Sequence, residues 1–143
     1  RCLLRRLSLP GNAVGDDGAA AIAVAVATRV LGRGGGLEEL DLSENRIGII
    51  GASALGERLS APGVGLRALV LSDNKVGPYG AMDLAKVVGS SPYLEHLYLA
   101  GNGIGNPGAL AMAGALQRSP SHLSELGLQS NHISAMGVAA LYE

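Results

Sequence analysis

Residues 37–48 read LEELDLSENRIG, and four similar segments occur along the 143-residue chain. All five follow the pattern L-x-x-L-x-L-x-x-N-x-(I/V), and the other four begin at Leu4 (LRRLSLPGNAVG), Leu66 (LRALVLSDNKVG), Leu94 (LEHLYLAGNGIG) and Leu123 (LSELGLQSNHIS). Their asparagines are 33, 29, 28 and 29 residues apart. A unit of this length in five copies is typical of a repeat protein, in which each unit packs only on its neighbours.

The first half of each unit predicts a short strand with one buried face. Side chains alternate in direction along a strand, so Leu40 and Leu42 are expected to point inward while Asp41 points outward. The asparagine follows where the chain turns out of the strand, and its amide can donate and accept hydrogen bonds at once. We therefore expect a buried structural ladder that ties the turns together, formed by Asn12, Asn45, Asn74, Asn102 and Asn131.

The second half of each unit predicts a helix with one buried face. A glycine recurs six residues after each asparagine, and small or apolar residues follow it at positions i, i+3, i+4 and i+7. The expected core-facing sets are Ala19, Ile22, Ala23, Val26; Ala52, Leu55, Gly56, Leu59; Ala81, Leu84, Ala85, Val88; and Ala109, Met112, Ala113, Leu116. Asp16, Asn106 and Ser134 are the predicted N-caps of their helices.

Strands that alternate with helices predict a curved α/β solenoid of about five strand–helix units. Neighbouring strands lie about 4.8 Å apart and packed helices roughly 8–10 Å apart, so the parallel sheet should line the concave side and the helices the convex side. The glycine-rich segment 32–36 lengthens the first connection and is expected to be a loop. We expect one domain over residues 1–143, as part of a longer array, because neither end carries a polar cap.

The combined motif L-x-x-L-x-L-x-x-N-x-I-G-x-x-G-A-x-A-L resembles the ribonuclease-inhibitor-like subclass of leucine-rich-repeat proteins. The resemblance runs from about Leu4 to Tyr142. The subclass includes the ribonuclease inhibitor, the Ran GTPase-activating protein and the sensor domains of NOD-like receptors, so the resemblance implies the horseshoe fold and leaves the function open. The chain departs from the ribonuclease inhibitor in having a single cysteine, and Ser134 replaces the glycine of the other four units.

Catalytic motifs are missing from the sequence, and we expect neither enzyme activity nor a cofactor or metal site. The chain has no P-loop, no H-E-x-x-H and no G-x-S-x-G motif. Its histidines, His96, His122 and His132, fall at different places in the repeat and are expected to be solvated rather than metal ligands. A net charge of −1 gives no reason to expect nucleic acid as a partner. The longest apolar run, Ala19–Ala27, is far shorter than the ~20 residues of a membrane span.

Two surfaces are candidates for binding a partner protein. On the concave face, the outward strand positions bring Val70 and Tyr98 side by side. An aromatic and an aliphatic side chain surrounded by polar groups are typical of an interface hot spot. The proposed concave contacts are therefore Glu39, Asp41, Val70, His96 and Tyr98. The alternative is that valine and tyrosine are there as good strand formers.

On the convex face, the first and fourth helices are apolar all round, which points to Val24 and Leu110 as contacts. The alternative is a bias of the chain toward alanine. The positions expected to face outward on the four complete helices are Ala20, Ala21, Val24, Ala25; Ser53, Ala54, Glu57, Arg58; Met82, Asp83, Lys86, Val87; and Leu110, Ala111, Gly114, Ala115.

The predicted function is a non-catalytic protein-interaction scaffold or a structural subunit of a larger assembly, in the cytoplasm. By the family resemblance, two alternatives stay open. A GTPase-activating role would need an exposed arginine, for which Arg5, Arg6 and Arg46 are candidates. An enzyme-inhibitor role would use the acidic concave face against a basic enzyme.

Overall fold

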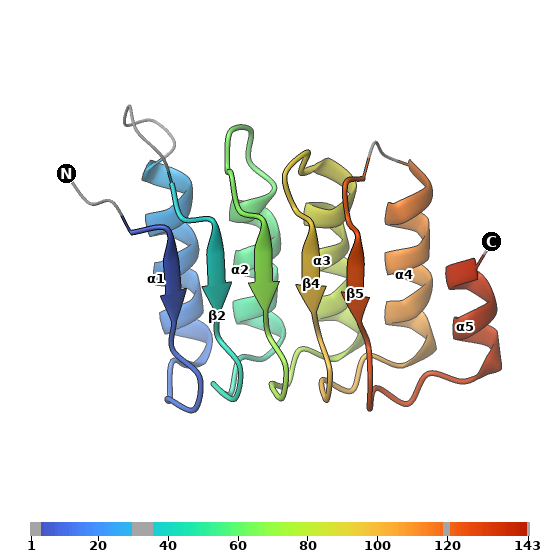
Figure 1. The fold of residues 1–143 in the computed structure, drawn as a ribbon. Coiled ribbons are helices and arrows are strands. Elements are labelled where there is room, and N and C mark those ends of the chain that lie inside the picture. Colours follow the sequence, from blue (N-terminus) through green and yellow to red (C-terminus); the bar gives the residue numbers. More distant parts are fainter. Residues whose placement is uncertain (1–3, 30–35, 119–120, 143) are drawn as a thin grey trace.

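The computed structural model describes residues 4–29, 36–118 and 121–142, and Figure 1 shows the fold. Five three-residue strands alternate with five helices. Their bounds are β1 Arg6–Ser8, α1 Gly15–Arg29, β2 Glu39–Asp41, α2 Ile49–Leu59, β3 Ala68–Val70, α3 Gly77–Ser90, β4 His96–Tyr98, α4 Gly105–Arg118, β5 Glu125–Gly127 and α5 Ala135–Tyr142. The predicted loop at 32–36 lies, up to residue 35, outside the described residues.

The strands form one parallel sheet in sequence order, and the helices form a second layer behind it (Figure 1). The register places equivalent repeat positions opposite each other, so that Leu40 pairs with Leu69 and Leu69 with Leu97. Each helix contacts no other helix than those of the adjacent repeats. The predicted α/β leucine-rich-repeat solenoid is therefore confirmed.

The core lies between the two layers and is made of repeated leucines. Leu40 and Leu42 are buried, as are their counterparts in β3 and β4, whereas Asp41 is half-buried on the opposite side. Leu7 and Leu126, in the terminal strands, are half-buried because each lacks a neighbouring repeat on one side. The inward and outward directions predicted from alternation in the strands are confirmed.

The predicted helix faces are buried, except that Ile22 and Leu116 are half-buried. Two residues expected to face outward, Val87 and Ala115, are instead buried, and that prediction was wrong. Each central helix packs on two neighbouring helices as well as on the sheet, so its buried arc is wider than one face. A Cβ on Gly89 would lie 3.8 Å from the Cβ of Ala115, which shows that Ala115 faces α3.

Glycines allow the helices to approach each other closely. A Cβ on Gly56 of α2 would collide with the backbone carbonyl of Asp83 in α3. A Cβ on Gly80 would lie only 3.0 Å from the Cβ of Ala52 in α2. The recurring glycine six residues after each asparagine is therefore a packing position, where a larger side chain would push neighbouring repeats apart.

Two of the predicted N-caps stabilise the following helix rather than their own. Asp16 lies inside the first turn of α1, and its Oδ1 accepts hydrogen bonds from the backbone N–H groups of Gly48 (2.7 Å) and Gly51 (2.9 Å) at the start of α2. Asn106 of α4 likewise accepts from the N–H of Ser134 at 2.9 Å, immediately before α5. The own-helix assignment was wrong for Asp16 and Asn106, because stacking places these side chains over the next helix N-terminus.

The turn after each strand has a fixed backbone conformation. The residue before each asparagine has a positive φ in all five repeats, and it is glycine in two of them. The other three are Glu44, Asp73 and Ser130, each with a φ of 55°. A left-handed conformation costs a non-glycine residue roughly 1–2 kcal/mol, so these three turns are strained relative to the two turns that have glycine at this position.

Candidate functional site

The asparagines tie each repeat to the one before it. The Nδ2 of Asn74 donates to the carbonyl of Leu42 in the preceding repeat (3.0 Å) and to that of Leu71 in its own (2.9 Å). Its Oδ1 accepts from the N–H groups of Asn45 (3.0 Å) and Ile47 (2.9 Å). One buried side chain therefore satisfies backbone groups on both sides of a repeat boundary, which holds the strand face in register.

The same arrangement recurs at Asn45, Asn102 and Asn131, which are also buried. Asn12 differs, since it is exposed, and its side chain donates only to carbonyls of its own turn. The described chain has no strand before β1 with which Asn12 could pair. The expectation of five buried asparagines is therefore wrong for Asn12.

On the sheet surface, acidic residues of the second repeat are held by internal contacts. The Nε of Arg6 lies 2.6 Å from Oε2 of Glu39 across the β1–β2 pair, and this contact raises the pKa of Arg6. Asp41 accepts hydrogen bonds from the backbone N–H and the hydroxyl of Ser43, at 3.0 and 2.8 Å. Glu39 and Asp41 are thus on the expected face, although both already have partners within the chain.

The centre of the sheet surface carries an aromatic pair. Val70 and Tyr98 are direct neighbours in the β3–β4 register and are half-buried. The rings of His96 and Tyr98 lie parallel, with centroids 6.4 Å apart and an interplanar angle of 4°. The structure therefore brings the three central candidates together on one surface.

Glu125 of β5 joins this pair, although it was not among the predicted contacts. The Tyr98 hydroxyl donates to Oε2 of Glu125 at 2.7 Å, and Nδ1 of His96 lies 3.6 Å from the same oxygen. The hydrogen bond to Glu125, followed by partial desolvation and the carboxylate charge, raises the pKa of Tyr98. The β4–β5 register, which pairs His96 with Glu125, is the signal that could have identified it.

We call Val70, His96, Tyr98 and Glu125 the strand-face cluster. Within the described ranges, Nδ1 of His96 is the buried side-chain polar atom that has no hydrogen-bond partner. The cluster thus combines an aliphatic side chain and two aromatic rings with a carboxylate, and the buried Nδ1 of His96 has Glu125 beside it, at 3.6 Å. Such a mixture suits contact with a polar protein surface better than it suits a dry catalytic pocket.

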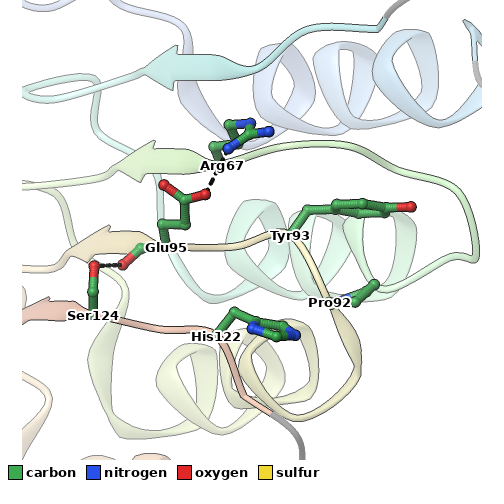
Figure 2. A pocket seen from close by; sticks show the side chains of 6 residues that line it. All are labelled: Arg67, Pro92, Tyr93, Glu95, His122 and Ser124. Carbon is green, nitrogen blue, oxygen red and sulfur yellow. Dashed lines mark hydrogen bonds and ion pairs between the residues drawn. The ribbon is translucent and has the colours of Figure 1, made fainter.

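A hollow of about 430 Å³ lies next to this cluster, since Oε2 of Glu95, which helps to line it, is 4.0 Å from Nε2 of His96. Figure 2 shows the side chains that line the hollow. The Arg67 guanidinium lies 2.6 Å from Oε1 of Glu95 and closes one end of the hollow. Tyr93 and His122, from the connections that precede β4 and β5, project to the same side at the other end (Figure 2). Pro92 and Ser124 complete the lining. Sequence reasoning missed this hollow because part of its lining lies in connections outside the repeat motif.

The three histidines do not come together. His96 is on β4, His122 precedes β5, and His132 is in the turn that follows β5. Across residues 4–29, 36–118 and 121–142, no group of three or more His, Cys, Asp or Glu side chains is placed to hold a metal ion. In the same ranges, no helix combines the length and the apolar character that crossing a membrane requires.

The two convex candidates lie on separate parts of the helix layer. Val24 and Leu110 are both exposed, on α1 and α4, which do not contact each other. At the position equivalent to Val24, α2 and α3 carry the exposed charged residues Glu57 and Lys86. The two apolar side chains therefore do not form a single patch.

The repeat units match the family model for a leucine-rich repeat at residues 2–23, 37–56, 66–85 and 90–113. The matches span more than half of the chain, and the chain belongs to the leucine-rich-repeat family. No curated protein sequence matches it as a relative.

Among solved structures, the chain is similar to Leiomodin-1 Actin-Binding Site 2 (ABS2), with a TM-score of 0.79 and 14% sequence identity. The similarity covers 96% of this chain and 76% of that chain. At this identity the two share a fold, and residue roles do not transfer between them.

Proposed function

We propose that the chain is a non-catalytic interaction module of the ribonuclease-inhibitor-like subclass, which binds a protein partner through the strand-face cluster. The observation that carries the proposal is the contiguous set of His96, Tyr98 and Glu125, presented on the open face of a rigid parallel sheet. Aromatic side chains held by neighbouring polar contacts lose little entropy when a partner binds, and they dominate interface energetics.

The adjoining hollow extends the proposed contact surface. Arg67 and Glu95 satisfy each other's charge at its inner end, while the Tyr93 ring is exposed at its mouth. A partner side chain that enters the hollow would meet an aromatic face beside a neutralised ion pair. This arrangement fits recognition of an uncharged or aromatic group at the edge of the interface.

A GTPase-activating role is less well supported by the geometry. Arg5 and Arg6 are engaged by Glu38 and Glu39, with nitrogen–oxygen distances of 2.7 and 2.6 Å. Each guanidinium would have to leave its exposed ion pair to contact a nucleotide phosphate, whereas Arg46, the third candidate, is exposed in the turn after β2. The inhibitor alternative loses support for a similar reason, because Glu39 and Asp41 already have partners within the chain.

Affinity capture from a cell lysate, followed by titration calorimetry with the purified partner, tests the strand face. The test variant is Val70→Glu/Tyr98→Ala, and the matched control is Glu57→Ala on the helix layer. Loss of a hot-spot aromatic typically costs about 2 kcal/mol or more, so we expect at least a ~30-fold weaker Kd for the test variant and an unchanged Kd for the control.

Actin is included as a purified candidate because the similar solved structure bears that name. A partner that binds wild type and the test variant with equal affinity would show that the strand-face cluster is not the interface. Loss of binding in the control alone would move the interface to the helix layer.

A further inference from the structure

One outward-facing position of the strand surface carries no side chain. Gly127 of β5 is in register with Tyr98 of β4 and Val70 of β3, and it is buried although it faces outward. A Cβ at this position would lie 2.8 Å from Cδ1 of Tyr98 and 3.2 Å from Oε1 of Gln129. The Tyr98 ring therefore covers Gly127 and leans across β5, in space that a larger residue would fill.

This lean brings the Tyr98 hydroxyl to Glu125, which lies two residues before Gly127 on the same strand. The hydroxyl donates to Oε2 of Glu125 at 2.7 Å, so the ring is held both above Gly127 and at its hydroxyl end. The ring of His96 lies beside it with a nearly parallel plane, at an interplanar angle of 4°. An aromatic ring fixed in this way loses little conformational entropy when a partner binds.

Among the described residues, Glu125 forms no ion pair with a lysine or an arginine. Its side chain is 58% exposed, and its contacts are the Tyr98 hydroxyl and Nδ1 of His96, the latter at 3.6 Å. Glutamates on and beside the preceding strands are paired with arginines at nitrogen–oxygen distances of 2.6–2.7 Å, and these are Glu38, Glu39 and Glu95. Glu125 differs from them in having a carboxylate that can still accept a basic partner.

We propose that the strand-face cluster binds an arginine side chain of the partner protein, whose guanidinium stacks on the Tyr98 ring and pairs with Glu125; this inference rests on the function proposed above. A cation is attracted to the face of a tyrosine ring. A carboxylate also binds a guanidinium strongly, because the planar group donates parallel hydrogen bonds. Oε1 of Glu125 is available for this contact, since the Tyr98 hydroxyl donates to Oε2.

Other side chains fit this position less well than arginine. A lysine ammonium can pair with Glu125, but it is not planar and cannot stack on Tyr98 while it does so. An uncharged side chain would remove water from Glu125 without replacing it by a charge, which costs free energy. The uncharged or aromatic group that fits the hollow at Tyr93 is a separate contact, at the edge of the same interface.

Charges around the cluster favour a basic group from the partner. Arg67 lies 2.6 Å from Oε1 of Glu95, so the positive charge of this arginine is neutralised within the chain. Asp41 pairs with Val70 in the β2–β3 register and places a second carboxylate on the other side of the cluster. Complementary charge of this kind mainly sets which partner binds and in what orientation.

The probe is a library of random seven-residue peptides displayed on phage and selected on the purified chain. We expect the selected peptides to share an arginine. One of them is then synthesised with arginine and with citrulline, which has a similar shape and no charge, and titration calorimetry gives both Kd values. Both contacts of the guanidinium depend on its charge, so we expect the citrulline peptide to bind at least ~10-fold more weakly.

Three variants locate this effect. Glu125→Gln removes the charge and keeps the shape, and the difference between the two peptides should fall to about 3-fold or less. Glu44→Gln is the matched control, because it removes an exposed carboxylate in the turn after β2, and it should keep the ~10-fold difference. Gly127→Ala retains the carboxylate and the ring but displaces the ring, and it should weaken binding of the arginine peptide about 5-fold or more. Far-ultraviolet circular dichroism establishes that each variant is folded.

A selection that yields no arginine-dependent peptide would overturn the proposal. A citrulline effect of the same size in wild type and in Glu125→Gln would also overturn it, and an unchanged Kd in Gly127→Ala would rule out the leaning ring as a contact. Peptides without arginine that lose binding in Tyr98→Ala would leave the strand face as the interface and refute only the arginine assignment. Selected peptides that bind Tyr98→Ala as tightly as wild type would count against the strand face itself.

Discussion

Replacing Asn74 with alanine tests whether the asparagine ladder stabilises the solenoid across repeat boundaries. The substitution removes the bonding partner from two buried N–H groups, those of Asn45 and Ile47, and from the carbonyl of Leu42. The Leu71 carbonyl loses one of two donors and keeps the hydrogen bond from Asn102. Each buried polar group left without a partner costs roughly 1–3 kcal/mol. Local relaxation and water entry lower the sum, and we expect a loss of about 3–4 kcal/mol from the free energy of unfolding.

Asn12→Ala is the matched control within the same chain. Asn12 is exposed, and its side chain donates only to the carbonyls of Leu9 and Pro10 in its own turn. Water can replace these bonds, so the expected loss is less than about 1 kcal/mol. The measurement is urea unfolding of both variants and wild type, followed by circular dichroism, with the midpoint and slope fitted together.

Equal losses in the two variants would refute the reasoning, because they would show that burial and contacts across the repeat boundary do not decide the stability. Asn74→Asp serves as a second variant. An aspartate keeps an oxygen that can accept from Asn45 and Ile47, but its carboxylate cannot donate to Leu42 or Leu71 and would bury a negative charge against their carbonyl oxygens. At neutral pH, its loss of unfolding free energy should therefore be at least as large as that of Asn74→Ala.

Three further predictions follow from packing, backbone conformation and electrostatics. Gly56→Ala forces a methyl group into the backbone of α3 and should lower the free energy of unfolding by about 2 kcal/mol or more. Gly114→Ala is the control, because its Cβ would meet only the flexible end of an arginine side chain, and it should raise the free energy of unfolding by about 0.5–1 kcal/mol in the same urea experiment. Glu44→Gly should raise the free energy of unfolding by about 0.5–1 kcal/mol, because glycine adopts the φ of 55° without strain. A lower free energy of unfolding in this variant would contradict the reasoning. The pKa of Tyr98 is raised above 10.0, so the stabilisation from its hydrogen bond to Glu125 is present below pH 10 and is lost as the pH rises through the raised pKa. Glu125→Gln should return the pKa of Tyr98, followed by near-ultraviolet absorbance, toward 10.0. An unchanged titration would exclude Glu125 as the cause of the shift.

Much of the fold could be predicted because the same pattern of apolar and polar positions occurs in all five repeats. The alternation of side chains along a strand predicts that Leu40 and Leu42 are buried and that Asp41 is not, and the helical spacing of apolar residues predicts the inner face of each helix. The errors arose where the relevant neighbour belongs to another repeat. Asp16 bonds to the start of the next helix, and Val87 is buried because its helix has neighbours on both sides.

The candidate site, too, was predicted from the sequence only in part. The sequence identified Val70, His96 and Tyr98 because their place in the repeat puts them on the outer side of adjacent strands. It did not identify the hollow, because Tyr93 and His122, two of the residues that line it, lie in connections without a repeating pattern. The bond between Tyr98 and Glu125 also depends on how two side chains lie across a strand pair, and the motif leaves this undetermined.

By itself, the sequence determined the class of fold, the register of the repeats and the outward-facing strand residues, because each of these follows from periodicity along a single chain. Tertiary structure alone decided which side chains are satisfied within the molecule and which remain available. It showed that Arg6 and Glu39 neutralise each other and that Asn12 lies outside the buried ladder. It also showed that apolar side chains near the start of the helices, such as Ile50 and Tyr79, are exposed. These properties depend on distances between residues about one repeat apart, and such distances exist only once the repeats have stacked.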